Sequence, residues 1–273
     1  MEKPRLEQID SNEWRFEQPA EFERYDGRLD EAIELMYGEA DERAEAILRD
    51  IIAQCPEYLD AYHHLAIVLD EQGQDEEALR LWEQAVEIGE SAFPEGFAEG
   101  DNRLEWRWLE NRPFLRAYNG LALAYFERGD AETAARMFEQ LLVWDPTDSQ
   151  GARALAIAAY LSQKRPEKVL EVTRRYEGDN IVDTLYGRVL AHLQLGQREQ
   201  ARDALQTAIE KYPLVAKELA KPWHKPPKGM KPDMVTVGGA DEAYAYWQYV
   251  GRYWRETPGA LDFVREELAR LQA

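Results

Sequence analysis

The chain has 273 residues, a net charge of -20, and an apolar fraction of 45%. This length and apolar content allow a sizeable core, and the absence of a Ser/Gly linker favours one elongated domain over two globules. The negative charge disfavours nucleic acid and anionic membranes as partners. The single cysteine, Cys55, excludes an internal disulfide framework and suits a reducing compartment.

The amino-terminal sequence MEKPRLEQID has no apolar signal region, and no run of about 18 apolar residues occurs in the chain. Neither export nor membrane insertion is therefore expected, and the cytoplasm is the expected location. Residues 1–27 are interpreted as an N-terminal extension.

Residues 28–213 contain a repeating pattern. Ala44, Leu48 and Pro56 mark the second helix of a first repeat, which recurs 34 residues later at Ala78. A period of about 34 residues is typical of tetratricopeptide repeats, in which each repeat is a pair of antiparallel helices. Because one such pair cannot bury its own apolar face, neighbouring repeats must stack.

The stretch RAYNGLALAYFERGDAETAARMFEQLLVWDP, residues 116–146, is a complete copy of the repeat. Its apolar residues recur at three- and four-residue steps, as on one stripe of a helix. Gly129 breaks the first helix, Asp130 is a suitable N-cap for the second, and Pro146 ends it. The residues that carry the pattern are Tyr118, Leu121, Ala122, Tyr125, Ala134 and Phe138.

One irregularity lies before this copy. The step from Ala78 to Ala134 is 56 residues, which is one period plus 22, and it predicts an insertion at about residues 90–113. The stretch LEWRWLENRPFLR, residues 104–116, mixes apolar and charged positions at helical spacing. We expect it to lengthen the first helix of the next repeat.

The repeats continue downstream of residue 146. A further copy is marked by Gly196, Ala201, Leu205, Ala208 and Pro213. The step from Ala134 to Ala201 is one residue short of two periods, so a degenerate repeat is expected between them, around residues 155–176. Its second helix is expected to begin at Pro166.

The carboxyl-terminal region departs from the repeats. Residues 214–240 are rich in proline and lysine and are predicted to form a loop, and residues 241–273 are predicted to form capping helices. Thr257 is expected to cap the last helix and Pro258 to open it. Aromatic residues in this region fit either the core of a terminal repeat or a ligand cage. Together these elements predict an all-α fold, a right-handed array of antiparallel helix pairs closed by a loop and capping helices.

The order of these parts resembles the suppressor-of-tumorigenicity-seven family and its uncharacterised prokaryotic relatives. The resemblance is carried by YLDAYHHLAIVLDEQGQDEEALRLWEQAVEIGESAFPEGF, ENRPFLRAYNGLALAYFERGD, PTDSQGAR, AIEKYPLV and DEAYAYWQYVGRYWRETPGAL. It implies a repeat scaffold without a defined biochemical role. Since the chain has no long additional segments, the resemblance favours a prokaryotic relative.

Candidate binding residues follow from the repeat register. In tetratricopeptide arrays the first helix of each repeat lines a concave groove, so its exposed positions are candidates for binding a protein or peptide. Registered on Gly73 and Gly129, these residues are Asp60, His63, Ile67, Asp70, Arg116, Asn119, Leu123, Phe126, Gln150, Arg153, Ile157 and Tyr160.

No enzyme class is supported. Asp60, His63 and His64 share one helix face, but the other two histidines are distant in sequence, so a structural role is favoured over a metal site. Cys55 has no adjacent base in sequence and is expected to pack. No phosphate-binding loop occurs. The chain is therefore predicted to be non-enzymatic, with no cofactor and no metal.

Charge is unevenly distributed. Residues 1–113 contain 31 acidic and 11 basic residues, whereas residues 114–273 contain 22 of each. The acidic part is either a solvated surface, as in adaptation to high salt, or a surface for a cationic partner. A lid over the groove could be formed by Lys221, Trp223, Lys225, Lys228 and Lys231, unless Trp223 and the prolines pack on the last helix pair.

Two hypotheses for function follow. The first is a protein- or peptide-binding adaptor that uses the concave face. The second is a structural or self-associating protein whose groove is filled by its own C-terminal loop or by another copy of the chain.

Overall fold

The computed structural model describes residues 2–97, 100–178, 180–231 and 234–271, and it confirms the all-α class. Parts of the expected insertion, loop and C-terminal cap, residues 98–99, 232–233 and 272–273, lie outside the described residues. The chain forms two compact units, Met1–Ala152 and Arg153–Ala273, rather than the single domain that the composition favours. No helix in the described ranges is long and apolar enough to cross a membrane.

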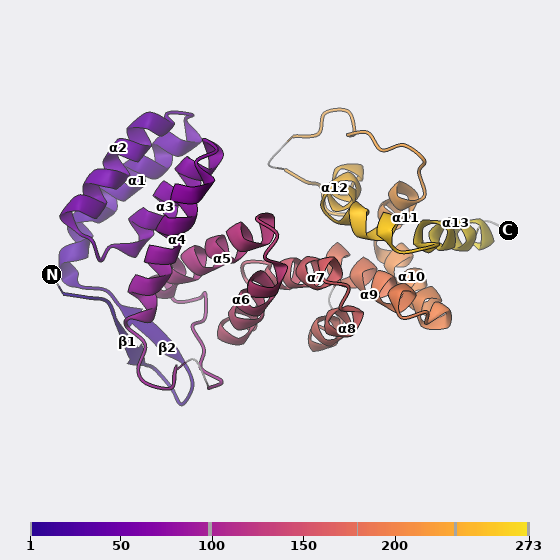
Figure 1. The fold of residues 1–273 in the computed structure, drawn as a ribbon, viewed down its shortest axis with the longest axis horizontal. Helices are drawn as coiled ribbons and strands as arrows, with labels where there is room; N and C mark the ends of the chain where they lie inside the picture. The colour runs from indigo at the N-terminus through magenta and orange to yellow at the C-terminus, as the bar shows by residue number, and fades with distance from the viewer. Residues whose placement is uncertain (1, 98–99, 179, 232–233, 272–273) are drawn as a thin grey trace. The chain divides into compact units, whose positions relative to one another are not determined.

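The first unit is built on three helix pairs in which consecutive helices pack together, α1 with α2, α3 with α4, and α5 with α6 (Figure 1). Packing of α2 on α3 and of α4 on α5 joins the pairs. Their bounds are α1 Glu23–Tyr37, α2 Asp41–Gln54, α3 Leu59–Glu71, α4 Asp75–Glu90, α5 Arg112–Glu127 and α6 Ala131–Trp144.

The turns within these pairs explain the glycines of the repeat. Gly73 and Gly129 have φ angles of 74° and 89°, a left-handed conformation that glycine adopts without a Cβ clash. At the turn of the first pair Glu39 adopts the same conformation with φ of 56°. After Gly129 the carboxylate of Asp130 accepts a hydrogen bond from the Thr133 N–H at 3.1 Å, so the expected N-cap is present.

The N-terminal extension forms an antiparallel hairpin of β1 (Arg5–Gln8) and β2 (Trp14–Glu17), which the repeat pattern did not predict. Its Phe16 side chain is fully buried, with its ring centroid 5.3 Å from that of Phe114. The insertion holds the hairpin in place, since Arg103 O accepts from the Trp14 N–H at 2.9 Å. The hairpin and the insertion also share an apolar contact, since the ring centroids of Trp14 and Phe97 are 5.6 Å apart.

The insertion lengthens the next helix only at its end, so the expectation for residues 104–116 holds for residues 112–116 alone: α5 has 16 residues, against 13 in α3. A single 3-10 turn, η3 (Leu109–Asn111), precedes α5, which begins at Arg112. Pro113 lies in the first turn of α5, where its missing N–H needs no partner, and a longer helix would place it in the interior. The Asn111 amide instead binds β2, accepting from Phe16 N at 2.9 Å and donating to Trp14 O at 3.1 Å.

The second unit continues with helix pairs that share the repeat spacing. Pro166 begins α8 and Gly196 ends the turn after α9, as expected. Lys164 takes the left-handed conformation at the turn before α8, with φ of 55°. The bounds are α7 Ala152–Ser162, α8 Pro166–Arg175, α9 Val182–Gln194, α10 Arg198–Lys211, α11 Pro213–Leu219, α12 Ala240–Glu256 and α13 Ala260–Arg270.

The C-terminal segment differs from expectation at both ends. The loop begins later than residue 214, because α11 occupies its first residues. Thr257 does not cap the last helix; its hydroxyl donates to Tyr253 O at 2.9 Å, and α13 begins after Gly259.

One of the two predictions for the loop is that Trp223 packs on the last helix pair. Trp223 is 81% exposed, so it does not do so. The neighbouring His224 makes the contact instead, its ring stacked on Trp247 with centroids 3.5 Å apart and its Nδ1 2.9 Å from Glu218 Oε1. Lys221 pairs with the same Glu218 carboxylate, whereas Lys225, Lys228 and Lys231 are exposed. The start of the loop is thus fixed to its own unit.

Candidate functional site

A cavity of about 330 Å³ lies in the first unit between the first helices of two successive repeats, α3 and α5. We call it the groove cavity. The repeat spacing places its lining on one face of each helix, at three- and four-residue steps. Seven residues that the register selected line it: His63, Ile67, Asp70, Arg116, Asn119, Leu123 and Gln150.

Trp82 from α4 and Gly120 from α5 meet at the wall of the groove cavity. The Trp82 Nε1–H donates to His63 Nδ1 at 3.2 Å, so His63 is a neutral imidazole with its proton on Nε2. A Cβ atom on Gly120 would lie 2.6 Å from Trp82 Nε1, so only glycine permits this approach. Burial, with smaller contributions from His64 and Arg116, holds the pKa of His63 well below its usual value.

An ion pair joins the two groove helices. Arg116 Nη2 on α5 lies 2.7 Å from Asp60 Oδ2 on α3. The Nε–H of the same guanidinium is buried without a hydrogen-bond partner, and so is Asn119 Oδ1, one helical turn away. One donor and one acceptor are thus unpaired in the wall of the groove cavity.

Carboxylates occupy the other end of the groove cavity. Burial raises the pKa of Asp70, and Asp75 raises it further. Burial likewise raises the pKa of Glu127, with contributions from Asp70 and Asp75. Like charges that are partly removed from water favour the arrival of a cation at this end.

The remaining predicted groove residues lie elsewhere. Asp60 and Phe126 are buried. Arg153, Ile157 and Tyr160 belong to the second unit, where Ile157 and Tyr160 are 1% and 6% exposed. The side chains of Ile157 and Tyr160 are therefore buried, and the guanidinium of Arg153 lies 4.9 Å from the centre of the Tyr176 ring.

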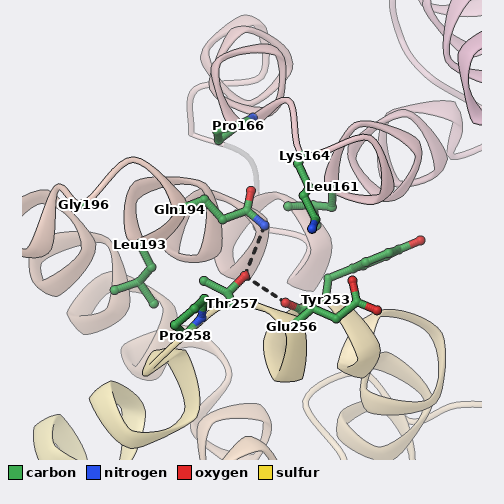
Figure 2. Close-up of a pocket in the computed structure, with 10 residues that line it drawn as sticks. All are labelled: Leu161, Lys164, Pro166, Leu193, Gln194, Gly196, Tyr253, Glu256, Thr257 and Pro258. Atoms are coloured by element: carbon green, nitrogen blue, oxygen red, sulfur yellow. Dashed lines mark hydrogen bonds between the residues drawn. The ribbon is translucent and has the colours of Figure 1, made fainter.

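The second unit contains its own cavity of about 420 Å³, which no sequence signal indicated (Figure 2). It lies among the C-terminal ends of α7, α9 and α12. Gln194 Nε2 donates to the Thr257 hydroxyl at 3.2 Å, while Gln194 Oε1 is buried without a hydrogen-bond partner. Lys164 and Glu256 supply one charge of each sign to the lining, so its charge selects neither cations nor anions.

The repeat pattern did not indicate the first groove helix, α1. Asp26 and Leu29 precede Asp60 and His63 by 34 residues and occupy the same repeat positions. This spacing was the available signal, but α1 lacks the Leu-small pair that identifies the later copies. In the described part of the chain, no group of three histidine, cysteine or acidic side chains is placed to hold a metal ion.

The paired helices, joined by turns that contain a residue with positive φ, define a helical-repeat protein of the tetratricopeptide type. Solved structures of such proteins have a similar fold. A tetratricopeptide repeat protein from Parabacteroides merdae aligns with a TM-score of 0.57 at 12% identity, over 91% of this chain and 79% of that one. The repeat protein YrrB aligns with 0.50 at 16% identity, over 71% and 93%. A putative kinesin light chain with nearly identical TPR-like repeats, from Podosopora anserina, aligns with 0.51 at 19% identity, over 68% and 94%. At these identities the likeness concerns the fold.

The family is identified by a second comparison. Residues 37–241 match the model of the family described as transcriptional repressor TCF25, so the chain belongs to that family. None of the curated proteins matches the chain. The resemblance to the suppressor-of-tumorigenicity-seven family is not confirmed.

Proposed function

We propose that the chain is a non-enzymatic adaptor whose first unit binds an extended segment of a partner protein in the groove cavity. The observation that carries this proposal is the pair of buried, unpartnered atoms, Arg116 Nε and Asn119 Oδ1. Leaving such groups unpaired costs about 1–3 kcal/mol each, and a partner that pairs them removes that cost.

A peptide backbone fits the two atoms. Each peptide unit offers one carbonyl acceptor and one N–H donor, which complement the guanidinium N–H and the amide oxygen. Ile67 and Leu123 supply apolar contact in the same cavity. The solved structure of YrrB is described as having an unusual peptide-binding site, which supports peptide recognition on this fold.

The family's description as a transcriptional repressor suggests a role in the repression of transcription. We propose protein contacts rather than DNA contacts for this chain. Residues 1–113 carry all of the net charge of -20, and a phosphate backbone is repelled by such a surface.

The test uses an array of randomised peptides of about ten residues, long enough to cross two helices, probed with the full chain. Asn119→Ala should reduce capture of the selected peptides about five- to tenfold, as expected for losing one hydrogen bond of about 1–1.5 kcal/mol. Gln84→Ala is the matched control, since Gln84 is an exposed amide on α4 outside the groove cavity. Equal capture by both variants, or capture of no peptide, contradicts the proposal.

A further inference from the structure

A second cavity of the first unit, of about 490 Å³, lies beside α1 and the N-terminal ends of α3 and α5. We call it the acidic cavity. Its lining includes no basic residue, while Phe22, Leu29 and Leu109 form part of an apolar wall. Five carboxylates line it: Glu23, Asp26, Asp30, Asp60 and Glu110.

Two of these carboxylates have basic neighbours. Asp60 pairs with Arg116, and Glu110 Oε1 lies 3.9 Å from Arg15 Nη1. No ion pair within the described residues involves the other three, Glu23, Asp26 and Asp30. The Tyr58 hydroxyl donates to Asp26 Oδ1 at 2.7 Å. The acidic cavity therefore keeps at least three uncompensated negative charges.

Two oxygen atoms in the lining of the acidic cavity are buried without a hydrogen-bond partner. Asp60 is only 9% exposed, and its Oδ1 has no hydrogen-bond partner. His64 Nδ1 lies 3.5 Å from Oδ1, but its nearer acceptor is the Asp60 main-chain oxygen at 2.8 Å. Gln18 Oε1, in the same lining, is also buried without a partner. Buried polar atoms in folded proteins are nearly always paired, so a donor placed in the acidic cavity would complete the hydrogen bonding of both acceptors.

The local potential is negative. Burial is the main reason that the pKa of Tyr58 lies far above its usual value; its hydrogen bond to Asp26 and the charges of Asp26, Asp60 and Asp30 raise it further.

We propose that the acidic cavity binds an arginine or lysine side chain of the partner segment. A metal ion would need oxygens within about 2.6 Å of one point, and the described carboxylates form no such group. A basic side chain instead carries its donors on a long apolar stem, which fits a cavity with carboxylates along an apolar wall. This inference rests on the proposed function, since the same segment would cross both cavities.

The ion pair between Asp60 and Arg116 separates the two sites. Asp60 lines the acidic cavity and Arg116 lines the groove cavity. A bound segment would thus place a basic residue on one side of this pair and its backbone on the other. The selected peptides should share one basic position at a fixed distance from their apolar residues.

The test compares positional preferences on the same peptide array. Wild-type chain should select arginine or lysine at one position, and replacing that residue with citrulline or norleucine should weaken binding about tenfold. Asp26→Asn with Asp30→Asn should abolish the preference, while asparagine still accepts from the Tyr58 hydroxyl. Glu31→Gln with Glu34→Gln is the matched control, because it removes two exposed carboxylates of the same helix outside the cavity.

A basic preference lost only in the Asp26/Asp30 variant supports the inference, provided that both variants show the same melting temperature. A preference kept in that variant, or lost equally in the control, overturns it and leaves the proposed function standing if Asn119→Ala still reduces capture. Basic peptides bound only after Lys221, Lys225, Lys228 and Lys231 are changed to Gln would identify the chain's own loop as the occupant and overturn a partner side chain.

Discussion

Arg116 and Asp60, 56 residues apart in sequence, join α5 to α3 through an ion pair with an Nη2–Oδ2 distance of 2.7 Å. The Asp60 side chain is 12% exposed, so removing Arg116 would leave a mostly buried charge unpaired. Arg116→Ala should lower the free energy of unfolding by about 2–3 kcal/mol, below the range for fully buried pairs because the arginine is partly hydrated.

Arg128→Ala is the control for this prediction. The two arginines are almost equally exposed, at 33% and 34%, but the partner of Arg128, Glu76, is 72% exposed. Loss of the ion pair between Arg128 and Glu76 should lower the free energy of unfolding by less than about 1 kcal/mol. Urea unfolding of both variants measures the difference, and equal costs would show that burial of Asp60 is not the deciding factor.

Phe138 tests the core of the first unit. Its side chain is fully buried in α6, as the repeat pattern predicts. Phe138→Ala should destabilise the protein by about 3–5 kcal/mol, the usual cost of emptying an aromatic site. Glu132→Ala, an exposed change on the same helix, should have little effect. A melting curve unchanged by Phe138→Ala would contradict the packing described above.

Gly120 tests the wall of the groove cavity. Its substitution by Ala would push against Trp82 and disturb the hydrogen bond to His63, at a cost of about 1–3 kcal/mol. Gly27 is a matched helical glycine, because a Cβ added there would meet nothing within 4 Å. Gly27→Ala should stabilise the protein by up to about 1 kcal/mol. Thermal unfolding measures the change in stability of each variant. If both substitutions stabilise the protein, or both destabilise it, the close approach of Trp82 to Gly120 is contradicted.

His63 should make stability depend on pH. Its pKa is lowered in the folded state, so below about pH 6.5 the unfolded chain binds a proton that the folded chain does not. Stability from this residue is therefore lost as the pH falls through that value. Between pH 7 and pH 5 the wild type should lose about 1–2 kcal/mol more than His63→Gln. Parallel curves for the two proteins would show that His63 accepts a proton readily when folded.

Substituting the lysines of the C-terminal loop tests the prediction that this loop forms a lid over the groove. If the loop is held by the acidic part of the chain, changing Lys221, Lys225, Lys228 and Lys231 to Gln should increase its cleavage by protease at low salt. High salt should increase cleavage of the wild type in the same way, because the Debye length falls to about 10 Å near 0.1 M. Equal cleavage in all four conditions would rule out an electrostatically held lid.

The sequence by itself determined the local elements of the repeats. Spacing places Tyr118, Leu121 and Ala122 on one helical stripe, and all three are buried. Gly129 and Pro166 mark the boundaries where backbone geometry requires them, because the left-handed turn and the missing N–H are properties of single residues. The same register brought His63, Ile67 and Asn119 to one cavity.

Tertiary structure alone decided the rest. Asn111 ends the insertion in a 3-10 turn because its amide satisfies the backbone of a strand 95 residues away, and no local pattern contains that partner. Asp60 Oδ1 and Gln18 Oε1 are likewise unpaired because no donor from another part of the fold lies within hydrogen-bond distance. Helical periodicity fixes which residues share a face, but the partners across that face are set by long-range packing, so the acidic cavity could not be predicted from spacing alone.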